Sequence, residues 1–446
     1  MSKNTTIDDF EFIDYDVFDD DKEVKRNKGK KKKRKKKKRG ALEKLVIAAE
    51  ALIAVLFACV IILYATPNMT SKILNSSWGQ SFLNSPFGQK FMSSMMDKEG
   101  YQNVFDSGYS KDNIKTNEEL DLSILDDYMN IALFGLDKGS YKDRIEGGDS
   151  CDCIMIVSIH KETSDVKILS IYRDTYLKIM NADGSFRRYF KVNSSYGGSK
   201  GGPEAIVNTL NTNLDLNIQD YVMVNFNGIA TIIDLLGGIE VNITEEEMNY
   251  INGYLTETRE ITGMDSPDLT TYGDNIHLNG LQATAYSRIR KTAIYFEDGT
   301  SLNNDYGRAA RQRNVITKLV AKAKSAGMEN VLKMCDEIFQ SDEEIFKTSI
   351  PYDDVVKLIP VVLNFSFGET AAFPFTLTTS GELGISLESG STVIASGLDY
   401  NVIQLHKFLF PEENYSPSST VADISEDIYY ETGAKTVRLE DYAGTE

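Results

Sequence analysis

The segments "NIALFGLD" (residues 130–137), "CDCIMIVSI" (151–159) and "VKILSIYRD" (166–174) decide the fold. Each is a short and almost continuous apolar run, which is typical of a β-strand that is buried on both faces. The runs "YVMVNF" (221–226) and "GIEVNI" (238–243) have the same character. We therefore expect a central sheet with both faces covered.

Helical patterns alternate with these strands, over residues 203–213, 227–236 and 306–326. Pro203 follows two glycines and suits the first turn of a helix, and Gly237 suits a helix end. Alternating strands and helices predict an α/β fold, with a central mixed β-sheet and helices on both faces. The segment 227–236 is apolar on nearly all sides, so it is either a core helix or one wall of a slot for a lipid tail.

The N-terminal part of the chain predicts a membrane anchor. Residues 1–39 carry 15 Lys/Arg and nine Asp/Glu, and they end in "KKKRKKKKR" (31–39). The next run, "LVIAAEALIAVLFACVIILYA" (45–65), has 21 residues and only Glu50 as a charge. That length can cross a hydrocarbon core of about 30 Å, and no signal-peptide cleavage site follows. We expect one transmembrane helix with a cytoplasmic N-terminus and everything after Ala65 outside the cell membrane.

Five segments follow from these patterns. They are a disordered cytoplasmic tail (1–42), the transmembrane helix (43–66), an extracytoplasmic stalk or small helical spacer (67–125), the main domain (126–412) and an acidic flexible tail (413–446). The part outside the membrane carries 32 Lys/Arg and 55 Asp/Glu, which argues against nucleic acid as a partner. The basic run could itself bind nucleic acid, but its place beside the anchor favours a contact with anionic lipid head groups.

The four cysteines do not form a disulfide framework. Cys151 and Cys153 are expected on the same face of one strand, as small core residues.

Charged residues stand at the ends of three strand runs. Asp137 ends the first run, Asp152 opens the second, and Arg173 and Asp174 end the third. A single charge at such a position usually solvates a loop. Ligands of open α/β sheets, however, collect at the carboxyl ends of strands, and the grouping of these charges favours a site.

The segment "AYSRIRK" (285–291) supplies two further cations, Arg288 and Arg290. On a strand, two residues with this spacing would face the same side.

A predicted helix begins near Asp305, which is a plausible N-cap. Arg308 and Gln312 fall on its apolar stripe, Arg311 flanks that stripe and Arg313 points away from it. A buried guanidinium needs an anion, so Arg308 indicates a bound ligand.

These residue types together indicate phosphate chemistry. Guanidinium groups, such as those of Arg308 and Arg311, bind phosphate oxygens, and a pair of aspartates suits Mg²⁺ or, in its place, Mn²⁺. The common serine-hydrolase, zinc-protease, P-loop and dinucleotide motifs are absent. The sequence therefore predicts a site for a pyrophosphate group.

Several motifs occur in the order found in the LytR-CpsA-Psr family, which the chain resembles over roughly residues 130–326. They are "IALFGLD", "DCIMIV", "ILSIYRDT", "KVNSSYGG", "YVMVNFNGIATIIDLLGGIEV", "LNGLQATAYSRIRK" and "DYGRAARQR". The resemblance implies an extracytoplasmic, Mg²⁺-dependent phosphotransferase of Gram-positive-type bacteria. Such an enzyme moves a teichoic acid or capsular polysaccharide from a polyprenyl-pyrophosphate carrier to peptidoglycan, and it holds the lipid tail in an apolar groove.

The resemblance also assigns roles. It implies metal binding by Asp137 and Asp152, and phosphate contacts by Arg173, Lys191, Arg288, Arg290, Arg308 and Gln312, oriented by Asp305. Asp174 or one metal aspartate is the best choice for a general base.

One departure from the family pattern is Ser150, which stands where the family often has arginine. The metal loop is also longer, and the insertion 292–304 separates Arg290 from Asp305; these two differences concern the shape of the cargo more than the chemistry. Two other functions fit the same residues. One is a non-catalytic regulator or scaffold of cell-wall assembly that binds polyprenyl phosphates, and the other is a lipid pyrophosphatase.

Overall fold

The computed structural model describes residues 104–106, 108–120, 122–137, 150–296, 299–339, 345–351, 366–411 and 413–442. All of them lie in the compact unit Thr66–Glu446. The predicted cytoplasmic tail and transmembrane segment fall outside the described residues. Among the helices that are described, none is both long and apolar enough to cross a membrane.

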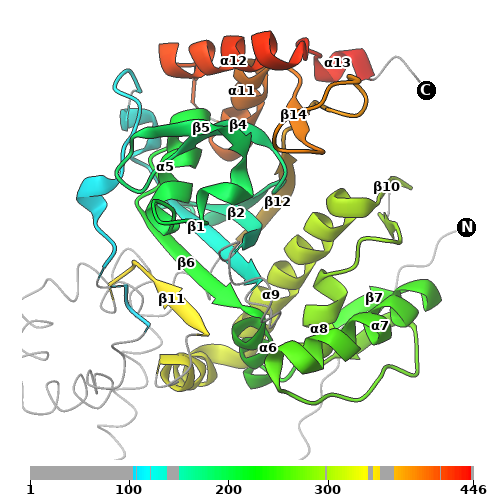
Figure 1. The fold of residues 1–446 in the computed structure, drawn as a ribbon. Coiled ribbons are helices and arrows are strands. Elements are labelled where there is room, and N and C mark those ends of the chain that lie inside the picture. Colours follow the sequence, from blue (N-terminus) through cyan, green and yellow to red (C-terminus); the bar gives the residue numbers. More distant parts are fainter. Residues whose placement is uncertain are drawn as a thin grey trace, which may run out of the picture. The chain divides into compact units, whose positions relative to one another are not determined.

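The core of the fold is a six-stranded sheet with the strand order β11-β6-β1-β2-β3-β12 (Figure 1). Antiparallel pairs (β1 with β2, β2 with β3, β6 with β11) and parallel pairs (β1 with β6, β3 with β12) are both present, so the prediction of a central mixed sheet is confirmed. Its strands are β1 (Tyr128–Asp137), β2 (Ser150–His160), β3 (Asp165–Ile171), β6 (Asp220–Asn225), β11 (Phe346–Thr348) and β12 (Ser366–Phe373).

The remaining described strands form two-stranded ribbons. The ribbons are β4 (Tyr176–Met180) with β5 (Phe186–Lys191), β7 (Ile239–Ile243) with β8 (Gly273–Leu278), β9 (Ile294–Tyr295) with β10 (Ser301–Leu302), and β13 (Leu377–Thr379) with β14 (Val393–Ala395). The predicted strand 238–243 thus exists as β7, but it lies outside the central sheet.

The three predicted helices are present, and the third, α9, runs further than its apolar pattern indicated. The α-helices are α5 (Pro203–Leu214), α6 (Phe226–Leu235), α7 (Glu245–Thr262), α8 (Gly280–Ser287), α9 (Asn304–Phe339), α11 (Leu398–Leu409), α12 (Ser419–Thr432) and α13 (Leu439–Tyr442). Short 3₁₀ helices are η1 (Lys111–Asn113), η2 (Leu122–Leu125) and η3 (Val192–Ser195).

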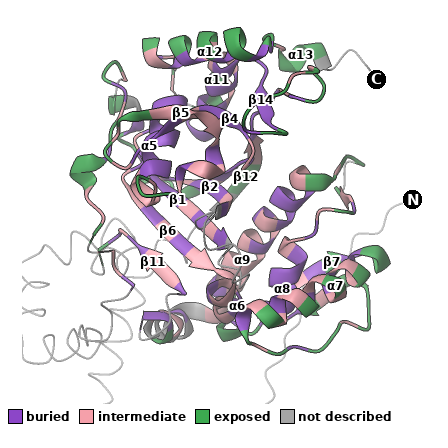
Figure 2. Ribbon diagram, viewed as in Figure 1, coloured by how far each residue is buried: buried purple, intermediate pink, exposed green. Residues whose placement is uncertain are grey.

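Both faces of the sheet are covered, because alternate side chains of its strands point to opposite sides. On one face Phe134 and Ile154 pack in a core that includes α5, α11 and α12. On the other face Ile131 and Met155 pack with Ile316 of α9. Helices α6 and α8 pack against α9, and α7 packs against α8 (Figures 1 and 2). The prediction of helices on both faces is confirmed.

A β-bulge interrupts the pairing of β1 with β2. Gly135 pairs with Cys153 and the next residue, Leu136, pairs with Cys151, so Asp152 is an extra residue on β2. A bulge changes which way the following side chains point. Cys151 accordingly packs in the core with Ile154, whereas Cys153 packs on the opposite face of the sheet. The prediction that the two cysteines share a face is wrong for this reason.

The domain boundaries need two corrections. The acidic segment 413–446 contains α12, whose Val421, Ile424 and Ile428 are buried in the main core, so its interpretation as a flexible tail is wrong. The cause is an apolar stripe at helical spacing, which the overall acidity of the segment obscured. In addition, the described part of the predicted stalk is built into the folded unit, where Val104 and Leu125 are buried.

Candidate functional site

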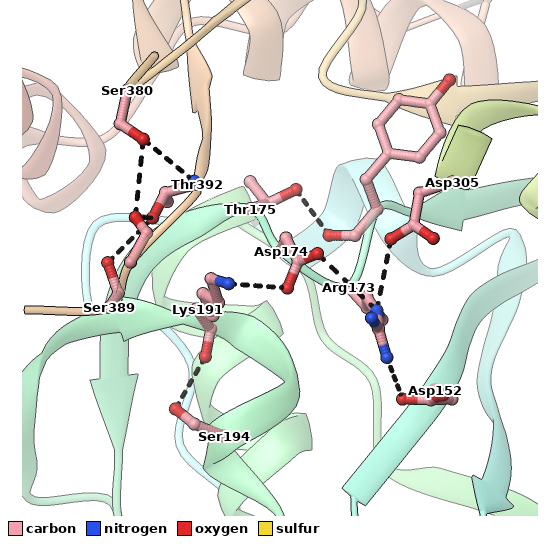
Figure 3. A network of polar contacts seen from close by, with 12 residues as sticks. Asp152, Arg173, Asp174, Thr175, Lys191, Ser194, Asp305, Ser380, Ser389 and Thr392 are labelled. Atoms are coloured by element: carbon pink, nitrogen blue, oxygen red, sulfur yellow. Dashed lines mark hydrogen bonds and ion pairs between the residues drawn. The ribbon is translucent and has the colours of Figure 1, made fainter. Parts of the chain in front are cut away.

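An arginine–aspartate cluster forms where β2, β3 and α9 meet, and it consists of Arg173, Arg290, Arg308, Asp152 and Asp305. Arg173 follows β3 directly. Its Nη1 donates to Asp152 Oδ1 at 2.6 Å, and its Nε donates to Asp305 Oδ2 at 3.2 Å (Figure 3). One guanidinium therefore joins the bulge of β2 to the first turn of α9.

The other two arginines bridge the same two carboxylates. Arg308 Nη1 lies 3.4 Å from Asp152 Oδ2, and its Nη2 lies 3.4 Å from Asp305 Oδ1. Arg290 Nη2 lies 3.6 Å from Asp152 Oδ2, and its Nε lies 3.2 Å from Asp305 Oδ1. Three guanidinium groups from different parts of the chain thus converge on two carboxylates.

Asp305 is the second residue of α9 and not its N-cap, which corrects the prediction. Burial opposes ionisation of this carboxyl, but the guanidinium groups of Arg308, Arg173 and Arg290 outweigh that effect and lower its pKa. The carboxylate thus serves to hold the arginines together.

A second pair of charges adjoins the cluster. Asp174 Oδ1 lies 3.2 Å from Lys191 Nζ, and Asp174 Oδ2 lies 3.6 Å from Arg173 Nε (Figure 3). The described site therefore has four cations and three carboxylates, which leaves an excess of positive charge. In addition, Arg308 is only 4% exposed, and its Nε has no hydrogen-bond partner among the residues that the structure describes. Such a group favours an added anion.

A cleft of about 390 Å³ opens beside the cluster. One wall comes from the segment after β12, and it is tied to the cluster through the backbone, since Val393 N donates to the carbonyl of Asp174 at 3.0 Å. Two aromatic rings in edge contact, Tyr172 and Tyr306, lie in another wall, with centroids 4.7 Å apart. The lining residues are Tyr172, Arg173, Asp174, Arg290, Asn304, Asp305, Tyr306, Thr379, Ser391, Thr392 and Val393. The tyrosines and the hydroxyl-bearing wall were not predicted, because nothing in the sequence connects residues 379–393 with this place.

Arg311 is not a substrate-binding residue, and this prediction is wrong. Its side chain is fully buried, and its Nε and Nη2 donate to Glu247 Oε1 at 3.0 and 2.8 Å. It also donates to the carbonyls of Ile289 and Thr292. Since these carbonyls flank Arg290, Arg311 positions that residue instead of contacting a ligand.

Arg288 lies apart from the cluster. It caps the end of α8, so the expectation that Arg288 and Arg290 share one face of a strand is wrong. The guanidinium of Arg288 pairs with Glu257 at 2.9 Å and lies over the ring of Phe226, with 4.8 Å to the centroid. A phosphate contact by Arg288 stays a prediction.

Gln312 lies two turns of helix beyond Asp305 on α9 and is half-buried, and its side chain makes no hydrogen bond to another described residue. The neighbouring Arg313 is buried at 7% exposure, although its place on the helix predicted that it points away. Edge strand β12 covers this side of α9, which the helical pattern alone did not show.

The predicted metal ligands come from the paired ends of β1 and β2. Asp137 is the last residue of β1 and pairs with Ser150, two residues before Asp152; the side chain of Asp137 is outside the described residues. In the part of the chain that the structure describes, no three or more His, Cys, Asp or Glu side chains are grouped so that they could hold a metal ion. Two carboxylates on adjacent strands are nevertheless a donor set that fits Mg²⁺, which takes one or two carboxylates beside phosphate oxygens.

A model of the LytR_cpsA_psr family matches residues 94–370. The chain belongs to the LytR-CpsA-Psr family. The resemblance described above is therefore confirmed, and the match begins within the predicted stalk, in agreement with the corrected boundary.

Similar curated proteins of the LytR-CpsA-Psr family include two transferases. The polyisoprenyl-teichoic acid–peptidoglycan teichoic acid transferase TagU of Bacillus licheniformis is 31% identical over 229 residues, which are 51% of this chain and 62% of that protein. TagU of Bacillus subtilis is 30% identical over 241 residues, 54% of this chain and 66% of that protein. Biofilm regulatory protein A of Streptococcus mutans is 27% identical over 264 residues, 57% of this chain and 60% of that protein. The chain thus spans less than two thirds of the length of each.

Among solved structures, Bacillus subtilis TagV is 23% identical with a TM-score of 0.46, over 65% of this chain and 98% of that one. The protein YwtF (TagT) with bound octaprenyl pyrophosphate lipid is 16% identical with a TM-score of 0.42, over 74% of this chain and 99% of that one. At these values the similarities are too weak to define the site.

Proposed function

We propose that this chain is a membrane-anchored, extracytoplasmic phosphotransferase that moves a glycopolymer from a polyprenyl-pyrophosphate carrier to peptidoglycan. The observation that carries the proposal is the convergence of Arg173, Arg290 and Arg308 on Asp152 and Asp305 beside an open cleft. The curated relatives named as teichoic acid transferases support the choice of reaction. A teichoic acid or a capsular polysaccharide is the expected cargo.

The arginines would bind the pyrophosphate and stabilise the charge that develops on it. Arg308 is buried, and a buried guanidinium would stabilise the phosphate charge more strongly than one in water. Arg173 and Arg290 are more exposed and line the cleft, so their side chains can adjust to contact the phosphate oxygens during the reaction. The protein would therefore contribute mainly positioning and electrostatics, as in other phosphoryl transfers.

In the proposed reaction, a hydroxyl oxygen of the peptidoglycan sugar bonds to the phosphorus next to the glycan. The bond from that phosphorus to the bridging oxygen breaks, and polyprenyl phosphate leaves. Asp174 lines the cleft and would accept the hydroxyl proton, and Lys191, whose Nζ lies 3.2 Å from Asp174 Oδ1, would orient this carboxylate. A divalent cation held by Asp137 and Asp152 would neutralise phosphate charge.

The test is transfer of glycan from a purified lipid-linked pyrophosphate to a peptidoglycan oligosaccharide. We expect Arg308→Ala and Asp152→Ala each to lower the transfer rate about 100-fold or more, since the loss of one such donor costs about 2.7–4 kcal/mol. Arg438→Ala is the matched control, because Arg438 is exposed and its side chain makes no described contact. Transfer at the wild-type rate by both site variants would overturn the proposal.

The same assay separates the two other functions. A regulator or scaffold would bind the polyprenyl phosphate without releasing product, a role that the name of the Streptococcus mutans relative brings to mind. A pyrophosphatase would release glycan phosphate with no acceptor present, because water would replace the sugar hydroxyl.

A further inference from the structure

A second cavity, of about 610 Å³, lies beside α9 and contains none of the arginine–aspartate cluster. Its walls come from α9, from edge strand β12, from the turn between β7 and α7, and from residues 294–296 of the insertion. We call it the Arg313 cavity, after the cation in its wall.

Arg313 lacks the counter-ion that its neighbours have. The three buried arginines of α9 among the described residues are Arg308, Arg311 and Arg313, which are 4%, 0% and 7% exposed. Arg308 meets two carboxylates, and Arg311 meets Glu247. Within the described parts of the chain, Arg313 forms no ion pair, and its buried Nη1 has no hydrogen-bond partner.

The other charges of the cavity do not neutralise Arg313. Glu247 is occupied by Arg311, and Asp274 is exposed to solvent. Lys318, about one turn further along α9 than Arg313, adds a second cation to the wall. A buried unpaired guanidinium is costly, and an anion in the cavity would remove that cost.

The rest of the lining suits a sugar. Tyr295 and Phe296 are 70% and 39% exposed, and both come from the insertion that distinguishes this chain. Exposed rings offer flat apolar surface with little entropy to lose on binding. Asn242, Asn314 and Thr370 place amide and hydroxyl groups beside these rings, where they can fix the orientation of a polar ligand.

We propose that the Arg313 cavity binds a saccharide unit that carries a phosphate or a carboxylate, with Arg313 as the partner of the anion and Tyr295 and Phe296 as the surface for the sugar ring. The inference rests on the proposed function in one respect: the saccharide would belong to the glycan that is transferred or to its acceptor. Phosphate would indicate the cargo polymer, and the lactyl carboxylate of a muramyl sugar would indicate the acceptor.

The experiment is a titration of the purified folded protein with three ligands, followed by calorimetry. They are a glycerol-phosphate oligomer, a disaccharide with N-acetylmuramic acid, and the neutral N-acetylglucosamine disaccharide. We expect one acidic ligand to bind at least about tenfold more tightly than the neutral one. Arg313→Gln should remove that preference, because the neutral amide cannot form a charge-assisted hydrogen bond with the anion. The acidic ligand that responds identifies the source.

Two further variants keep the result clear. Tyr295→Ala changes an exposed side chain, so it should have little effect on folding, and it should lower the affinity for the same acidic ligand. Arg308→Ala should leave this binding in place, which separates the cavity from the cluster. Equal affinity for acidic and neutral saccharides, or unchanged binding by Arg313→Gln and Tyr295→Ala, would overturn the inference. Loss of transfer in Asp152→Ala would still support the proposed function in that case.

Discussion

Arg311 and Glu247 form a fully buried ion pair in which two guanidinium nitrogens donate to one carboxylate oxygen. The second carboxylate oxygen of Glu247 accepts from the backbone N–H of Thr244 and so completes the capping box of α7. One side chain therefore fixes both the start of α7 and, through Arg311, the carbonyls on either side of Arg290.

Glu247→Gln should lower the free energy of unfolding by about 3–5 kcal/mol, because it leaves the charge of Arg311 buried and unpaired. Urea denaturation measures this. Glu257→Gln is the comparison: its carboxylate pairs with Arg288 but is 43% exposed, so a loss of no more than about 1 kcal/mol is expected. Equal losses in the two variants would contradict the role given to Glu247.

The stability of the protein should depend on pH through Asp305. Its pKa in the folded state lies below the ordinary value of 3.8, so the unfolded state binds the proton more readily. The stabilisation is therefore complete above about pH 4 and is lost as the pH falls through the lowered pKa. Unfolding measured from pH 2 to 6 should show a smaller acid-dependent loss in Asp305→Asn. A variant with the same slope as the wild type would exclude this carboxyl as the cause.

The C-terminal helix α12 should contribute to stability. Ile424→Ala removes a side chain that is 0% exposed and should cost about 2–5 kcal/mol. Tyr430→Ala changes a residue of the same helix that is 73% exposed, and it should stay within about 0.5 kcal/mol of the wild type. Thermal unfolding of both variants decides whether this segment belongs to the cooperative unit.

Gly135 should be needed to hold the bulge. A Cβ at this position would lie 2.8 Å from Cys153 Cβ, so Gly135→Ala must shift β2 next to Asp152. We expect a loss of about 1–3 kcal/mol together with slower transfer. Gly253→Ala in α7 is the control, because a Cβ there meets nothing within 4 Å. Full activity in Gly135→Ala would mean that Asp152 does not depend on the bulge.

Glycan transfer should require a divalent cation. Treatment with EDTA should abolish it, and Mg²⁺ or Mn²⁺ should restore it, because the excess charge of the cations alone does not balance a pyrophosphate. Asp152→Ala should need far more Mg²⁺ than Arg438→Ala for the same rate. Undiminished transfer in EDTA would remove the metal from the mechanism.

Much of the fold was readable in the sequence, because doubly apolar strands and long apolar stripes depend on local patterns. Local pattern also placed Arg173 just after a strand and Arg308 near the start of a helix, whereas Asp152 lies in a bulge inside β2 and does not open it. The wrong predictions for the arginines have one physical origin. Whether a cation meets a ligand or an internal carboxylate depends on distant residues, as Glu247 shows for Arg311. Whether Arg313 meets a carboxylate among the described residues is likewise decided by parts of the chain that are distant in sequence.

The extra residue in β2 has a consequence for engineering. In a regular strand, the side chain of Asp152 would point to a face of the sheet that is fixed by the residues after it. A change in the packing of those residues would then also change the direction of the carboxylate. Asp152 stands outside the residue-by-residue pairing of β1 with β2. The direction of its side chain is therefore independent of the alternation of side chains along the rest of β2. Deleting Asp152 would restore regular alternation in β2 and leave Cys151 and Cys153 on the faces that they already occupy, so the core would be kept and only the carboxylate of the cluster would be lost.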